Sequence, residues 1–210
     1  MYDTRMETNT QMPFVAKTFN LPALSGISAK NIEEHLKLYA GYVNNVNSNI
    51  EKMSKLSEGM FKNGEDNAYL IAELFRRFSF EYNGMRNHEV YFASLSGGPK
   101  ALNPESELAK KITKDCMSLE IFLMGFKNIA LTRGVGWAVL WYDKKDDRLL
   151  ASWVDEQHLG QLNGCEMILA LDMWEHAYVY DYPTSEKKKY IEAFFENLNW
   201  EVIEENFKNS

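Results

Sequence analysis

The chain has 210 residues, a formal net charge of -7, 45% hydrophobic and 13% aromatic residues. This acidic balance argues against a nucleic-acid binder, which needs lysine and arginine to neutralise phosphates, and against an anionic membrane partner. No apolar run has membrane-spanning length and no signal-like segment occurs, so we expect a cytoplasmic protein. Cys116 and Cys165 are far apart in the sequence, which predicts free thiols in a reducing compartment.

The first half of the chain is predicted to be helical. Residues 1–16 are polar and irregular, which predicts an N-terminal tail or a segment that precedes a later start at Met12. Ser28 is an expected N-cap, and apolar residues recur every three or four positions after it. A polar break follows at 64–66, and a second segment with the same period ends near residue 95. Residues 17–98 are therefore predicted to form a long antiparallel helical hairpin.

The second half, residues 99–210, is predicted to be a C-terminal α/β domain. Residues 105–127 predict one or two short helices, with Ser118 as a cap between them. Three short apolar segments, 136–142, 148–154 and 166–171, have the composition of strands, and the first two are joined by a polar turn. A helix over 186–198 and a last one after Trp200 complete an α+β fold with a three-stranded antiparallel sheet flanked by helices.

The chain contains four histidines, His35, His88, His158 and His176. A single histidine on a helix face is more often a hydrogen-bonded core residue than a ligand. His35 and His88, however, lie on the inward faces of the two long helices, and His176 follows closely after Asp172, which ends an apolar strand. A carboxylate there is costly unless it binds something. Three imidazoles and one carboxylate suit iron, manganese or zinc.

Five ordered sequence blocks resemble the iron/manganese superoxide dismutase family. The segment DMWEHAY at 172–178 is similar to the family's DxWEHAY signature, and NHEVYF at 87–92 is similar to its second-ligand helix. Further blocks are GVGWA at 134–138, NLNW at 197–200, and LPAL at 21–24 followed by IEEH at 32–35. The resemblance extends from about residue 17 to 205, so it covers nearly the whole chain.

The resemblance implies a mononuclear redox site and its reaction. His35, His88, Asp172 and His176 would be the protein ligands of one iron or manganese ion per subunit, with solvent in a fifth position. Iron is slightly favoured, and both metals are compatible with these ligands. Superoxide and protons would be the substrates, converted to dioxygen and hydrogen peroxide.

The resemblance also implies roles for residues around the metal. Tyr42 would be the entrance tyrosine that relays protons, and Trp137 and Trp174 would line the cavity and exclude water. Relatives carry a glutamine whose hydrogen bond tunes the redox potential of the metal. This glutamine lies on the second helix or on the loop before the last strand. Because Gly84 occupies the first of these places, His158 is predicted to take the glutamine's part, as in one subgroup of the family.

Two positions depart from the family pattern at its subunit gate. Tyr39 stands where a gateway histidine is common, and Val179 stands where many relatives carry its tyrosine partner. Glu175, which in relatives reaches the metal-bound histidine of the neighbouring subunit, is retained. We therefore expect a homodimer or a tetramer, with an altered gate.

Three other interpretations fit parts of this pattern. A ferrous oxygenase with two histidines and one carboxylate usually has a β-barrel, which this largely helical chain cannot form. A helical interaction protein with core histidines leaves Asp172 unexplained. A family member that keeps the fold without the activity would explain the altered gate but not the intact ligands.

Overall fold

The computed structural model describes residues 12–210. Its first element, α1 (Ala29–Asn63), begins at Ser28, whose hydroxyl accepts the backbone N–H of Asn31 at 3.1 Å. The helix ends at Gly64, which adopts the left-handed conformation with φ 68°, a conformation that costs glycine little. Both the predicted cap and the predicted break are confirmed.

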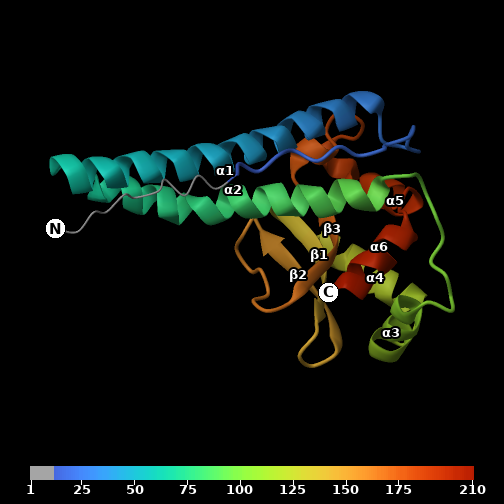
Figure 1. Ribbon diagram of the computed structural model, residues 1–210. Coiled ribbons are helices and arrows are strands. Elements are labelled where there is room, and N and C mark those ends of the chain that lie inside the picture. Colours follow the sequence, from blue (N-terminus) through green and yellow to red (C-terminus); the bar gives the residue numbers. More distant parts are fainter. Residues whose placement is uncertain (1–11) are drawn as a thin grey trace.

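The second element, α2 (Ala68–Leu95), runs back along α1 and completes the predicted hairpin. Figure 1 shows the two helices side by side, with the turn between them projecting beyond the rest of the protein. The C-terminal half of α2 is the buried half, and it packs against the sheet. Residues near the end of α2 and the beginning of α1 therefore lie deep in the molecule.

The sheet has three antiparallel strands, β1 (Gly136–Asp143), β2 (Arg148–Asp155) and β3 (Glu166–Asp172), in the order β2-β1-β3. The predicted hairpin and third strand are confirmed. The central strand β1 is buried over its first six residues, which explains its uninterrupted apolar sequence. The register places Trp137 opposite Asp172, so the end of β3 meets the beginning of β1.

The remaining helices surround the sheet and confirm the α+β class. Helices α3 (Glu107–Cys116) and α4 (Leu119–Ala130) are separated at Ser118, which caps α4, and α4 packs on β1 and β2. A short turn η1 (Glu175–Ala177) follows β3 and contacts α1. After η2 (Thr184–Glu186), helices α5 (Lys187–Glu196) and α6 (Trp200–Asn209) close the chain.

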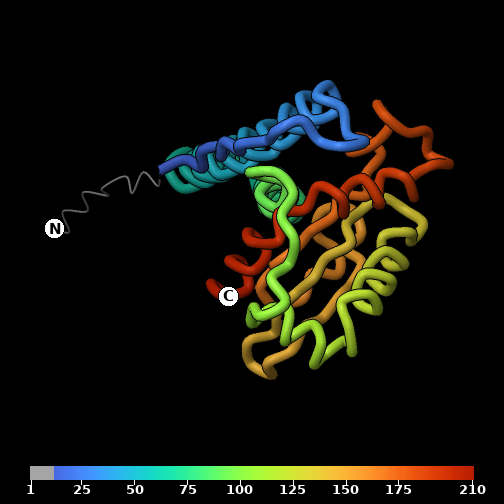
Figure 2. The backbone as a smooth tube through the Cα atoms, turned by 90° about the vertical axis from the view of Figure 1, so that its right-hand side faces the viewer, coloured from blue at the N-terminus to red at the C-terminus, as the bar shows by residue number. Residues whose placement is uncertain are grey.

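The segment before α1 is extended and follows the hairpin, as the dark blue tube in Figure 2 shows. Phe14 and Asn47 exchange two hydrogen bonds of 2.9 Å, and the Gly97 N–H donates to the Asn20 carbonyl at 2.8 Å. Residues 12–16 of the predicted tail are thus attached to α1, whereas residues 1–11 lie outside the described part. None of the helices formed by residues 12–210 has the length and apolar character needed to span a bilayer.

Candidate metal centre

The four predicted ligands come from four different elements. His35 lies on the buried face of α1 and His88 on the buried face of α2, Asp172 is the last residue of β3, and His176 lies in η1. The antiparallel hairpin brings the first two side chains together. The pairing of β1 with β3 places Asp172 beneath the hairpin. The tight turn after β3 then brings His176 back toward it.

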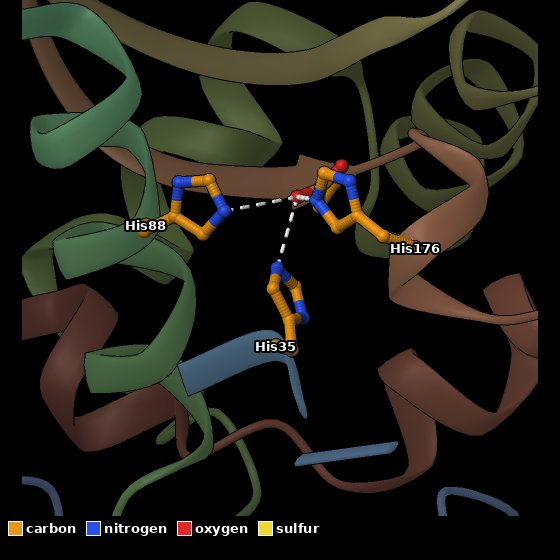
Figure 3. Close-up of side chains that lie close together, drawn as sticks. His35, His88 and His176 are labelled. Carbon is orange, nitrogen blue, oxygen red and sulfur yellow. Dashed lines mark hydrogen bonds and ion pairs between the residues drawn. The ribbon is translucent and has the colours of Figure 1, made fainter. Parts of the chain in front are cut away.

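These side chains converge on one point (Figure 3). The Nε2 atoms of His35 and His176 each lie 3.1 Å from Asp172 Oδ2, and His88 Nε2 lies 3.6 Å from it. One donor atom from each of the four residues lies within 4.8 Å of all the others. Among residues 12–210 this is the one cluster of histidine, cysteine and carboxylate groups with metal-binding geometry.

The protonation of His88 suits a ligand. Its Nδ1 lies 2.6 Å from the Gly84 carbonyl oxygen, so this nitrogen carries the proton and donates it. The opposite atom, Nε2, is buried and finds no hydrogen-bond partner within residues 12–210. Burial lowers the pKa of His88 to about 3 and also lowers that of His35, so both rings are neutral. A neutral imidazole with an orphaned, inward-facing nitrogen is the form that binds a metal ion.

Asp172 supplies the negative charge of the cluster. Burial favours its neutral form, but the charge of His176 and the hydrogen bonds of His176 and His35 prevail and hold its pKa below the usual range. Its other oxygen, Oδ1, accepts the backbone N–H of Trp174 at 2.8 Å, which fixes the orientation of the carboxylate. The residues therefore fit one redox-active cation held by three nitrogens and one oxygen.

Comparison with known proteins agrees with this donor set. Residues 104–206 match the family model described as iron/manganese superoxide dismutases, C-terminal domain. The chain is 34% identical to a superoxide dismutase [Fe] of Aquifex aeolicus over 188 residues, which is 89% of this chain and 87% of that protein. The chain belongs to the iron/manganese superoxide dismutase family. It is also 33% identical to a superoxide dismutase [Fe] of Pyrobaculum aerophilum, covering 85% of this chain and 82% of that protein, and 33% identical to a superoxide dismutase [Mn] of Mycolicibacterium fortuitum, covering 82% and 80%.

Aromatic rings surround this superoxide dismutase cluster. The Tyr42 and Trp137 rings each have centroids 5.0 Å from that of His88, and the Trp174 ring stacks 5.9 Å from His176. Trp137 is fully buried, whereas Tyr42 and Trp174 are partly exposed. The three aromatic residues named in the sequence analysis therefore lie next to the candidate ligands.

Beside the cluster, Gln157 makes the hydrogen bonds to Tyr42 and Trp137, and the predicted His158 is its neighbour in the chain. The buried Gln157 amide donates to the Tyr42 hydroxyl at 2.9 Å, and its oxygen accepts the Trp137 indole N–H at 2.9 Å. The His158 ring instead meets the edge of Phe80 at a centroid distance of 5.7 Å, and its Nδ1 has no partner within residues 12–210. Gln157 was not among the predicted site residues, although relatives carry a glutamine on the loop before the last strand.

Gly84 makes close packing possible at this site. A β-carbon at this position would lie 2.5 Å from Tyr42 Cδ1, closer than real β-carbons approach other atoms. The absence of a side chain therefore lets the Tyr42 ring rest against α2, next to His88. Gly84 thus leaves room for the Tyr42 ring, and its carbonyl oxygen accepts the hydrogen bond that orients His88.

Tyr39 stacks on His88 at a ring-centroid distance of 6.4 Å, but its hydroxyl points away from the cluster. The hydroxyl accepts the Lys17 backbone N–H at 2.8 Å and donates to Glu89 at 3.3 Å. The buried Glu89 also pairs with the Lys17 ammonium at 2.9 Å and with Arg86 at 2.8 Å. Tyr39 thus links the extended N-terminal segment to α2.

The cluster is accessible from one side. The His176 side chain is 22% exposed, whereas those of His35, His88 and Asp172 are 0% exposed. Glu175 beside it is exposed, and Val179, three residues beyond His176, is 45% exposed. The turn that carries His176 is thus the outer wall of the centre.

Proposed function

We propose that this protein is a superoxide dismutase that converts superoxide and protons to dioxygen and hydrogen peroxide at one iron or manganese ion. The single observation that carries the proposal is the convergence of His35, His88, Asp172 and His176, each with a ligand atom facing the same point. Two neutral buried imidazoles and an ionised carboxylate are the protonation states that metal binding needs. The names of the relatives support the reaction.

The bound metal would supply the one-electron redox chemistry, by alternating between its divalent and trivalent states. Iron and manganese both accept nitrogen and carboxylate oxygen donors, so these four ligands do not select one of them. Relatives named for iron and a relative named for manganese match the chain at nearly the same identity. We propose that either metal is accepted, with iron slightly favoured.

Tyr42 and Gln157 are proposed to handle the proton that the reaction consumes. Burial and the charge of Asp172 raise the Tyr42 pKa above its ordinary value, so the phenol is protonated at neutral pH. Gln157 donates to the phenol oxygen and therefore leaves the phenol's own proton free to be donated toward the centre. Trp137 holds Gln157 from the other side, and Trp174 limits the access of water.

A homodimer is proposed through the turn at Glu175. This carboxylate is exposed beside a partly exposed ligand, next to apolar surface at Val179. A partner subunit covering this wall would dehydrate the cluster and strengthen its electrostatic interactions. Sedimentation equilibrium of the metal-loaded protein distinguishes monomer, dimer and tetramer.

The division into a hairpin at 17–98 and an α/β domain at 99–210, and a cytoplasmic location, are proposed on more general grounds. The sheet and its helices form after residue 99, and the site is assembled from both parts. Cys116 and Cys165 are free thiols, which agrees with a reducing compartment.

The test is to load the purified protein with iron or manganese separately and to measure metal content and superoxide consumption. We expect about one metal per chain, and His176→Ala should lower metal affinity and activity together, by roughly a hundredfold or more, because a ligand is lost. A metal-free, inactive wild type would refute the proposal. Activity that survives His176→Ala would refute the ligand assignment.

Two neighbouring variants decide which side chain tunes the site. Gln157→Leu should keep the metal but lose about tenfold in activity, because Tyr42 loses its hydrogen-bond donor. The matched control is His158→Ala, which removes the adjacent side chain and leaves that hydrogen bond in place. Equal losses in both variants would return the tuning role to His158.

A further inference from the structure

The approach to the metal centre is bordered by Phe80. Its ring lies 6.0 Å from that of Tyr42 and 6.5 Å from that of Trp174, the two partly exposed aromatics beside the ligands. Phe80 itself is half-buried and lies in α2, two turns before His88. The ring therefore belongs to the side from which solvent reaches His176.

Arg77 covers the outer face of this ring. Its guanidinium carbon lies 4.0 Å from the Phe80 centroid, so the planar group is held in place over the aromatic face. Within residues 12–210 Arg77 has no ion-pair partner, whereas its neighbour Arg76 is bound by both oxygens of Glu73, at 2.8 and 2.5 Å. The charge of Arg77 is therefore not neutralised by a carboxylate in contact with it.

The Arg77 charge lies close to the interior of the site. The Phe80 ring that Arg77 covers lies 6.0 Å from the Tyr42 ring, which in turn lies 5.0 Å from that of His88. Glu81 carries the competing negative charge on this side and accepts a hydrogen bond from the Asn45 amide at 3.0 Å. Arg77 is thus separated from Tyr42, beside the candidate ligands, by a single aromatic ring.

We propose that Arg77 attracts the anionic substrate to the metal centre. The inference rests on the proposed function and adds to it the residue that brings a small monoanion to a chain whose net charge is -7. A chain with this charge repels anions at long range, so a fixed, uncompensated cation at the entrance raises their local concentration. The planar contact with Phe80 keeps the cation at the entrance instead of leaving it free in solvent.

The test uses azide, a small monoanion, titrated into the iron-loaded protein and followed by visible absorption at about 10 mM and about 200 mM salt. Arg77→Gln should weaken azide affinity by about two- to fivefold at low salt, and the difference should shrink at high salt because the interaction is screened. Arg77→Lys keeps the charge and should restore most of the affinity. Arg76→Gln is the matched control, and it should bind azide as the wild type does.

Superoxide consumption at the same two salt concentrations is the second measurement, and kcat/KM should follow the azide affinities. Azide affinity and salt dependence that are equal in Arg77→Gln and Arg76→Gln would overturn the inference. An equal loss in Arg77→Gln and Arg77→Lys would also overturn it, because the packing on Phe80 would then be the cause. A wild type that binds azide as described but consumes no superoxide would refute the proposed function and leave the attraction of anions by Arg77 supported.

Discussion

At the scale of single residues, the packing of the site depends on Gly84, which has no side chain. Gly84 lies where α2 must approach Tyr42, and a β-carbon there would come within 2.5 Å of the ring. Gly84→Ala should displace Tyr42 from Gln157, destabilise the protein by about 1–3 kcal/mol and lower its activity, because overpacking exceeds the gain in helix propensity. Urea unfolding and superoxide consumption of the metal-loaded variant measure both effects.

Gly41→Ala provides the control within the same hairpin. A β-carbon at Gly41 would meet nothing within 4 Å, so alanine there should stabilise α1 by about 0.5–1 kcal/mol. If both alanine variants gained stability and kept full activity, the close contact between Gly84 and Tyr42 would not matter to the site.

The convergence of the four candidate ligands could be predicted at this scale, but the inward direction of Gln157 instead of His158 could not. The period of a regular helix or strand fixes the direction of each side chain. The inward direction of His35, His88 and Asp172 could therefore be predicted. Gln157 and His158 are adjacent in a turn that follows Glu156, which has a positive φ of 51°. Which of two neighbours turns inward there depends on the backbone conformation, which no periodicity encodes.

At the scale of elements, Tyr39 fastens the extended N-terminal segment to the hairpin. Its hydroxyl bridges the Lys17 N–H and the Glu89 carboxylate in a buried position. Tyr39→Phe should destabilise the protein by about 1–2 kcal/mol and speed hydrogen exchange at residues 12–20, with metal content unchanged. Tyr69→Phe is the control, because that side chain is 81% exposed on the same hairpin. Equal exchange rates in both variants would contradict a fastening role.

The helices and strands themselves followed from the sequence pattern. Ser28 and Ser118 mark helix starts, and Gly64 marks an end, because each satisfies a local requirement of the backbone. The attachment of residues 12–20 could not be predicted in this way. The segment has no regular period, and its hydrogen bonds to Tyr39 and Asn47 join positions 22 and 33 residues apart.

At the scale of the whole molecule, the candidate metal centre joins residues of the hairpin to the end of the sheet. Removal of the metal with a chelator should lower the melting temperature by about 10 °C, since a ligand held at a thousand times its Kd adds about 4 kcal/mol to the stability of a folded protein. Calorimetry of the apoprotein, and of the protein reloaded with iron or manganese, measures the shift. Identical melting of the apo and loaded forms would show that the cluster does not bind the ion tightly.

The four candidate ligands are spread along the chain, so they are synthesised at different times. His35 and Asp172 are 137 residues apart, and His176 comes four residues after Asp172. A chain emerging from the ribosome therefore presents two imidazoles long before the carboxylate and the last imidazole exist. The four donor groups come together only when the sheet closes under the hairpin, so a site that could hold the ion is complete only in the finished fold. Binding of a metal ion would therefore stabilise the completed fold and not the hairpin alone.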